Sequence, residues 1–206
     1  MDRYILLDID GILNGYHWYK HVLRKIILKV YNISKAELLS MICPINLYWL
    51  KKLLKKYPDS KIVLTSSWRA IWNSHPEVQK AFKKYNIEVS SMIPYGAVDI
   101  DPTKEIDLSD CDSLIRTVSW VAEESALSRE QQVDHFLKYA KGSQIVAWMN
   151  EKNIDPNNIK FVIFEDDYRD VCCYKCLKDH VAICSFYKRR FGIRRKQYKK
   201  AVKFLK

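Results

Sequence analysis

The sequence of 206 residues lacks long apolar runs, a signal peptide and an obvious disulfide framework. No apolar run approaches the roughly 18 residues that a transmembrane helix needs, so we expect no membrane span. The first residues lack the basic segment, apolar segment and cleavage site of a signal peptide, so we expect an intracellular, cytoplasmic protein. In such a protein, cysteines are more typical of free thiols than of disulfides.

The six cysteines are concentrated late in the chain, where four of them lie between Cys172 and Cys184. Cys173, Cys176, His180 and Cys184 have the residue types of a zinc site, but their spacing is not a standard one. The sequence leaves open whether this cluster binds a metal.

Acidic residues are in the minority, with 24 against 35 basic residues and a formal net charge of +11. Residues 188–206 contain no acid and are interleaved with aromatic residues. Their basic residues are Lys188, Arg189, Arg190, Arg194, Arg195, Lys196, Lys199, Lys200, Lys203 and Lys206. A basic surplus suits a polyanion, so we expect nucleic acid to bind here. The alternative is the solvated face of a terminal helix over residues 195–205, with Tyr198, Ala201, Val202 and Leu205 turned inward.

Paired carboxylates follow a short apolar segment at the start of the chain. Residues 4–7 predict a buried strand, and Asp8, Ile9, Asp10 and Gly11 come directly after it. Buried carboxylates are costly unless they are paired or bind a metal. The carboxyl end of a strand is where ligands lie in an α/β sheet. The pair therefore indicates one nucleophilic and one proton-transferring carboxylate sharing a hard cation, or else a solvated turn.

Two later apolar segments also end in polar residues. Residues 61–64 are followed by Thr65 and Ser66, whose hydroxyls either bind a phosphate or cap the next helix. Residues 161–164 are followed by a group of acids, of which Glu165, Asp166 and Asp170 are the candidates for a site. Three such strand ends suggest one shared site.

The remaining segments predict helices between the strands, which indicates an α/β protein. Residues 46–57 predict an amphipathic helix whose lysines form a solvated face. Ser128 and Gln131 predict a capping box that opens another helix. We expect a single domain over residues 1–206, in which the acidic segment at about 91–125 is irregular and forms an insertion or lid.

The three strand ends resemble, in order, motifs I, II and IV of the haloacid dehalogenase (HAD) superfamily of phosphotransferases. The continuation Ser66-Ser67-Trp68-Arg69 is most similar to the HAD domain of "Swiss army knife" RNA repair proteins. Residues 141–148 resemble the Arg-Gly-x-Glu-Ile-x-x-Trp segment of that subgroup, with Lys141 for Arg and Gln144 for Glu. The resemblance implies a three-layer Rossmann-like HAD fold with a central parallel sheet.

The resemblance also implies a Mg²⁺-dependent phosphomonoester hydrolase that acts through an aspartyl-phosphate. Asp8 would be the nucleophile and Asp10 the general acid and base. The implied metal ligands are Asp8, Asp166 and the main-chain carbonyl of Asp10. The implied phosphate-binding residues are Thr65, Ser66 and Lys141, with Lys138 as the second candidate for the cation. Glu165 and Asp170 would lie in the outer metal shell or orient the lysine.

The substrate is less constrained than the reaction. The basic surplus and the RNA-repair-like segment favour nucleic-acid ends or nucleotides. Two alternatives stay open, namely a small-metabolite phosphatase and a nucleic-acid-binding protein with a degenerate HAD core. The complete set of acids favours an enzyme.

Overall fold

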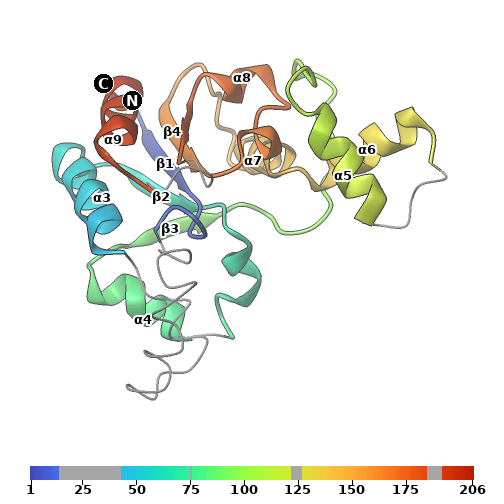
Figure 1. Cartoon of the computed structure of the whole chain (residues 1–206). Coiled ribbons are helices and arrows are strands. Elements are labelled where there is room, and N and C mark those ends of the chain that lie inside the picture. Colours follow the sequence, from blue (N-terminus) through green and yellow to red (C-terminus); the bar gives the residue numbers. More distant parts are fainter. Residues whose placement is uncertain (14–42, 75, 122–126, 185–191) are drawn as a thin grey trace. The chain divides into compact units, whose positions relative to one another are not determined.

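The computed structural model describes residues 1–13, 43–74, 76–121, 127–184 and 192–206, and its elements carry the labels of Figure 1. Lys188, Arg189 and Arg190 of the basic segment lie outside these residues. The chain divides into two compact units. The first unit comprises Asp2–Met92, Lys160–Asp166 and Ala182–Lys206, and the second comprises Met1, Ile93–Ile159 and Asp167–Val181. The expectation of one domain with an insertion at about 91–125 stays a prediction.

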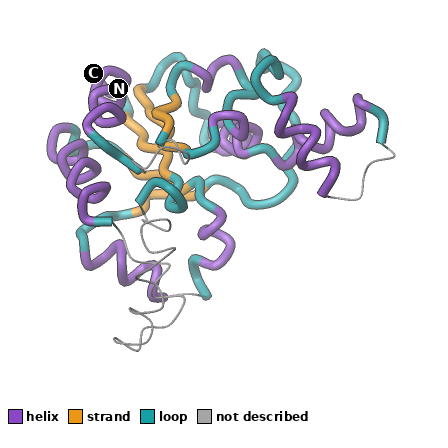
Figure 2. The backbone as a smooth tube through the Cα atoms, viewed as in Figure 1, coloured by secondary structure: helices purple, strands orange, loops and turns teal. Residues whose placement is uncertain are grey.

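A five-stranded sheet with the order β3-β2-β1-β4-β5 organises the first unit (Figure 2). The strands are β1 Arg3–Leu7, β2 Lys61–Leu64, β3 Val89–Met92, β4 Lys160–Glu165 and β5 Val181–Ile183. β1 pairs in parallel with both β2 and β4, and β2 pairs in parallel with β3. The predicted α/β, Rossmann-like parallel sheet is therefore confirmed.

The sequence explains why these strands occupy the centre of the unit. Ile5, Leu6 and Leu7 of β1 are fully buried, as is every residue from Phe161 to Phe164 in β4. Parallel strands are covered on both faces, so they require apolar residues at consecutive rather than alternate positions. The order of the strands reverses between β1 and β4, because β2 and β3 lie on one side of β1 while β4 and β5 lie on the other.

Among its described residues, the first unit has the helices α3 Pro44–Lys56, the 3₁₀ helix η1 Ser67–Ile71, α4 Pro76–Lys84 and α9 Arg195–Leu205. α3 and α9 lie side by side (Figure 1). The rings of Trp49 and Tyr198 are 5.3 Å apart, and the Tyr57 hydroxyl donates a 3.1 Å hydrogen bond to the carbonyl of Val202. Ala201 and Leu205 are buried, as the helical spacing predicts.

The second unit contains α5 Asp112–Val121, α6 Arg129–Tyr139, α7 Lys141–Glu151, the 3₁₀ helix η2 Tyr168–Asp170 and α8 Lys175–Lys178. The capping box between Ser128 and Gln131 is confirmed at the start of α6. The prediction that residues 91–125 are irregular is wrong for α5. The turn residues and scattered acids of this segment hid the helical pattern of the residues that follow Cys111. No helix in the described ranges is long and apolar enough to span a membrane.

Candidate active site

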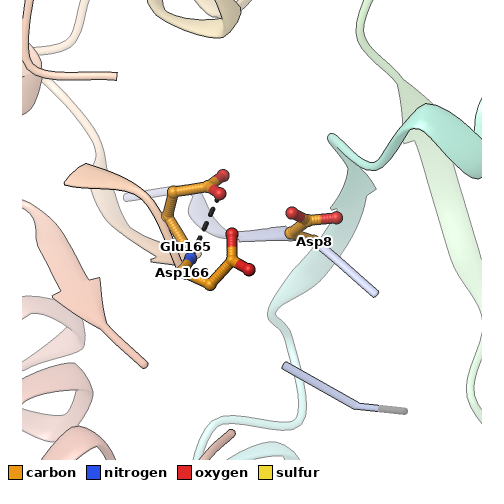
Figure 3. Close-up of side chains that lie close together, drawn as sticks. All are labelled: Asp8, Glu165 and Asp166. Atoms are coloured by element: carbon orange, nitrogen blue, oxygen red, sulfur yellow. Dashed lines mark hydrogen bonds between the residues drawn. The ribbon is translucent and has the colours of Figure 1, made fainter. Parts of the chain in front are cut away.

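Three carboxylates converge at the carboxyl ends of two neighbouring strands (Figure 3). Asp8 follows β1, while Glu165 and Asp166 stand at the end of β4. One oxygen from each carboxylate lies within 4.8 Å of the others. Asp8 is 5% exposed and Glu165 is 1% exposed, so most of this charge is removed from water. The site lies where the strand order reverses, which is where α/β sheets bind their ligands.

The sheet register brings these acids together. Leu7 pairs with Phe164, so the next residue on each strand, Asp8 and Glu165, reaches the same edge of the sheet. The backbone N–H of Asp8 continues the ladder with a 3.2 Å hydrogen bond to the carbonyl of Phe164. The N–H of Cys184 donates a 2.8 Å hydrogen bond to the carbonyl of Glu165, which fixes the end of β4 from its other side.

Backbone groups hold the orientation of two of the carboxylates. The N–H of Ile9 donates a 2.7 Å hydrogen bond to Oδ1 of Asp8, and the N–H of Asp166 donates a 3.1 Å hydrogen bond to Oε1 of Glu165. Each bond is short-range, so it restricts the side chain without requiring another element. The carboxylates are therefore positioned by the strand ends themselves.

Gly11 is required by its conformation and by the space around it. Its φ is +71°, in the left-handed region that side chains disfavour. A Cβ at this position would also lie 2.6 Å from Oδ2 of Asp166. The glycine of the Asp-x-Asp-Gly sequence thus allows the loop after β1 to approach the acid cluster.

Asp10 makes a contact that sets it apart from the three clustered acids. Its Oδ2 accepts a 2.8 Å hydrogen bond from the indole Nε1 of Trp68 in η1. Trp68 is 8% exposed, so this contact is largely shielded from water. The sequence alone indicates no role for Trp68. Its place just after β2, the neighbour of the strand that precedes Asp8, is a signal for such a contact, since a buried N–H needs an acceptor.

The two hydroxyls after β2 differ in their contacts. The N–H of Thr65 bonds the carbonyl of Leu7 at 3.0 Å, but its buried Oγ1 has no hydrogen-bond partner among the described residues. Oγ of Ser66 accepts a 3.5 Å hydrogen bond from the N–H of Trp68 and caps η1. The structure therefore supports the capping role for Ser66, while Thr65 offers a buried hydroxyl that suits an anionic ligand.

Lys141 and Asp170, both in the second unit, contact one another twice. The backbone N–H of Lys141 donates a 3.0 Å hydrogen bond to Oδ1 of Asp170, and its Nζ lies 3.7 Å from Oδ2. The Lys141 side chain is 13% exposed. Lys138, the second candidate, is instead half-exposed and pairs with Asp134 at 2.8 Å. The carboxylate of Asp134 is also the main reason why the pKa of Lys138 is raised.

Gly142 explains why a glycine follows the lysine in this segment. A Cβ there would lie 2.6 Å from Sγ of Cys173 and 2.8 Å from the carbonyl oxygen of Val171. The first turn of α7 can pack against residues 171–173 only without a side chain at this position. The close packing keeps Lys141 next to Asp170.

The cysteines do not form a metal site in the described chain. All six are free, and only Asp8, Glu165 and Asp166 form a described group whose ligand atoms converge. Burial raises the pKa of the Cys173 thiol to about 12. Burial, followed by the nearby carboxylates of the acid cluster, raises the pKa of the Cys184 thiol well above its ordinary value. Neutral thiols are poor metal ligands.

The acid cluster, in contrast, has the donor chemistry of a hard cation. Mg²⁺ and Ca²⁺ prefer carboxylate oxygens, and three carboxylates this close repel one another unless a cation or protons offset their charge. The residues present therefore fit Mg²⁺. The outer-shell or lysine-orienting role that the resemblance implies for Glu165 stays a prediction, and one oxygen of Glu165 lies together with those of Asp8 and Asp166.

The protein is an α/β protein with a parallel Rossmann-like sheet. Where the strand order reverses, it has three carboxylates that could hold a metal ion. The family model described as the HAD domain in Swiss Army Knife RNA repair proteins matches residues 4–188. This match covers most of the chain, and the protein therefore belongs to that family. A search of curated proteins found no match, and neither did a search of solved structures. Membership supports a phosphatase-like function of the HAD type.

Proposed function

We propose that this protein is a Mg²⁺-dependent phosphomonoester hydrolase that acts through an aspartyl-phosphate on Asp8. The observation that carries the proposal is the convergence of Asp8, Glu165 and Asp166 at the switch point of a HAD-family sheet. An acid cluster that bound no cation would destabilise the fold, because buried like charges repel one another and lose hydration.

Asp8 is the proposed nucleophile. A carboxylate oxygen of Asp8 forms a bond to phosphorus while the bond from phosphorus to the leaving oxygen breaks. The N–H of Ile9 holds Oδ1, so the carboxylate is restrained before the substrate arrives. A restrained nucleophile has given up most of its rotational freedom, which lowers the barrier to attack.

Asp10 is the proposed proton donor and acceptor. It gives a proton to the leaving oxygen in the first step and takes one from the attacking water in the second. The indole of Trp68 holds Oδ2 of Asp10 at 2.8 Å and so fixes the direction of the carboxyl group. The side chain of Asp10 serves the proton transfer, whereas the resemblance assigns its main-chain carbonyl to the metal.

The proposed Mg²⁺ ligands are Asp8, Asp166 and Glu165, together with the main-chain carbonyl of Asp10 that the family resemblance implies. When bound, the ion would offset the negative charge of the nucleophile and of the phosphoryl oxygens. Thr65 and Lys141 are the proposed phosphate-binding residues, and Asp170 is the positioning residue for Lys141. Ser66 contributes mainly by capping η1.

Nucleic-acid ends or nucleotides are the proposed substrate class. The net charge of +11 favours polyanionic substrates, and the matching family is described as a domain of RNA repair proteins. A small-metabolite phosphatase is the second candidate, favoured if nucleic-acid length does not affect turnover. The cytoplasm is the proposed location, since six free thiols suit a reducing compartment.

The test compares wild type with Asp8→Asn in hydrolysis of p-nitrophenyl phosphate, with Mg²⁺ and with EDTA. We expect turnover by wild type only with Mg²⁺, and loss of turnover in Asp8→Asn because an amide cannot serve as the nucleophile. Glu88→Gln, an exposed acid of the first unit, is the matched control. Turnover by Asp8→Asn within a few-fold of wild type would remove the covalent mechanism. A panel of 3′- and 5′-phosphorylated oligonucleotides, nucleotides and sugar phosphates then separates the substrate classes.

A further inference from the structure

The paired helices α3 and α9 carry a concentration of positive charge. Together they contain nine basic residues and no acidic residue. These residues, with the exposed Tyr48, define what we call the α3–α9 basic face. The basic residues are Lys51, Lys52, Lys55, Lys56, Arg195, Lys196, Lys199, Lys200 and Lys203, all of them exposed.

The two helices contact one another, and one lysine lies where they meet. Trp49 of α3 packs against Tyr198 of α9, with ring centroids 5.3 Å apart. Nζ of Lys52 lies over both rings, at 5.2 Å from Trp49 and 5.6 Å from Tyr198. Lys52 of α3 therefore contacts aromatic rings of both helices where the helices meet.

The lysines of this face differ from those of the second unit. Among the described residues, none of the nine basic side chains forms an ion pair with an acid. In the second unit, Arg116 and Arg129 pair with Asp112, while Lys175 pairs with Glu105. Lysines that serve only for solubility are commonly interspersed with acids. Unpaired charge gathered on one face is the pattern of a surface that binds phosphates.

One exposed aromatic ring, that of Tyr48, lies among the lysines. Tyr48 is 55% exposed and meets Trp49 edge-on at 5.1 Å, with Nζ of Lys52 lying 5.7 Å from its ring. An exposed ring next to cations suits an unpaired base, which stacks on the ring while its phosphate meets a lysine. Bases in a duplex are already stacked and do not use such a ring. The aromatic component therefore favours single strands.

Both helices start against the loop that carries the proposed catalytic acids. The N–H of Cys43, which precedes α3, donates a 2.8 Å hydrogen bond to the carbonyl of Leu13. Gly192, shortly before α9, approaches so closely that an added Cβ would overlap Nδ2 of Asn46 and the carbonyl oxygen of Ile12. Ile12 and Leu13 follow Asp8–Gly11 directly. The residues that lead into α3 and α9 therefore contact the residues that directly follow the loop of Asp8 and Asp10.

From these observations we propose that the α3–α9 basic face binds single-stranded nucleic acid. This proposal deepens the proposed function by assigning a surface and a partner. It rests on the proposed function, because that function supplies the reason for the protein to bind nucleic acid. Phosphates contact the lysines without sequence preference, and Tyr48 stacks with a base. The sequence alone predicts a nucleic-acid site in residues 188–206 and a solvated face for the lysines of residues 46–57. The structure joins these four lysines to the C-terminal helix.

The test measures binding of a fluorescent oligonucleotide of about 20 nucleotides, without terminal phosphates, in EDTA over a series of KCl concentrations. One variant carries Lys51, Lys52, Lys55 and Lys56→Gln, and a second carries Lys196, Lys199, Lys200 and Lys203→Gln. We expect each to raise Kd by about tenfold or more and to reduce the salt slope by about 0.7 for each phosphate that is no longer neutralised. An unaffected Kd in either variant would overturn the joint surface.

A charge-matched control removes four basic residues of the second unit, each of which is ion-paired. It carries Arg116, Arg129, Lys152 and Lys175→Gln. We expect its Kd to stay within about twofold of wild type, since paired surface charges contribute little. If this control weakens binding as much as the other two variants, net charge rather than the proposed face explains the affinity. Thermal unfolding curves recorded by circular dichroism check that each variant folds.

Tyr48→Ala tests the preference for single strands. Loss of one stacked base should raise Kd for the single strand by about tenfold and leave the salt slope unchanged. An unchanged Kd, or equal affinity for a duplex of the same sequence, would overturn the assignment to single strands. Comparing Kd for RNA and DNA versions of the oligonucleotide shows which of the two nucleic acids the face prefers. Asp8→Asn should bind the oligonucleotide like wild type. Binding by wild type without turnover would overturn the proposed function alone, and turnover by wild type without binding on this face would overturn this proposal alone.

Discussion

The indole N–H of Trp68 bonds a carboxylate oxygen of Asp10 at 2.8 Å, which joins the residues that follow β1 to those that follow β2. The two residues lie 58 positions apart in the chain. In the proposed reaction, this contact orients a group that donates a proton in one step and accepts one in the next. Trp68 is thus a positioning residue for Asp10 in the proposed reaction.

Replacing Trp68 by Phe should slow the proton-dependent steps without weakening substrate binding. Phe keeps most of the ring but removes the N–H, and a hydrogen bond to a charged group contributes about 1.5–3 kcal/mol. We expect kcat for an alkyl phosphate to fall about 10- to 100-fold, with KM nearly unchanged and a smaller loss for p-nitrophenyl phosphate. Trp72→Phe, a partly buried tryptophan shortly after η1, is the matched control. Equal losses in the two variants would show that Trp68 acts only through packing.

Asp10→Asn should distinguish the general acid from the nucleophile. A poor leaving group needs protonation, whereas p-nitrophenolate leaves readily without it, and general acid catalysis contributes roughly 10²–10⁴-fold. We therefore expect a large loss of kcat for an alkyl phosphate and a smaller loss for p-nitrophenyl phosphate. Steady-state rates across a series of leaving groups measure the difference. A uniform loss across the series would assign Asp10 another role.

Gly11→Ala should affect both stability and metal binding. The positive φ alone destabilises the variant by about 1–2 kcal/mol, and the new Cβ would press against Oδ2 of Asp166. Gly96→Ala is a matched control, because Gly96 has φ +97° but open space around its Cβ position. Urea unfolding should show a loss in both variants, while calorimetric titration with Mg²⁺ should show weaker binding only for Gly11→Ala. Unchanged Mg²⁺ affinity in Gly11→Ala would argue against Asp166 as a ligand.

Lys141→Met and Lys138→Met should separate the two candidates for the phosphate-binding lysine. Lys141 is mostly buried and held by Asp170, whereas Lys138 is half-exposed and pairs with Asp134. We expect kcat/KM to fall about 100-fold in Lys141→Met, the scale of removing one electrostatic interaction with a transition state, and to change by less than about threefold in Lys138→Met. The reverse pattern would reassign the role to Lys138. Asp170→Asn should reproduce part of the loss in Lys141→Met.

The sequence predicted the framework better than the contacts within the site. β1, β2 and β4 follow from consecutive apolar residues, and α9 follows from its helical spacing with the predicted bounds. The convergence of strand-end acids was also predictable, because parallel strands end at the same edge of a sheet. These features depend on local pattern and on a general rule of topology.

Other features depend on side-chain contacts between distant segments, which no local pattern encodes. The contact between Trp68 and Asp10 requires the register of β1 against β2. Glu165 joins the cluster because of its orientation at the end of β4, although its sequence position also allowed an outer role. The pairing of α3 with α9, which joins two basic segments far apart in the chain, was likewise visible only in the folded structure.

The pairing of β1 with β4 has a consequence for how the protein is made. β1 and β4 are far apart in the chain, since Leu7 pairs with Phe164, so β4 is synthesised long after β1. Until then, one edge of the central apolar strand has no partner and presents open backbone groups, a hazard for aggregation. Contacts between residues so distant in the chain also form slowly. The carboxylates of Glu165 and Asp166 arrive with the same strand that closes this edge, so acquisition of the proposed Mg²⁺ affinity during refolding would report the pairing of β1 with β4.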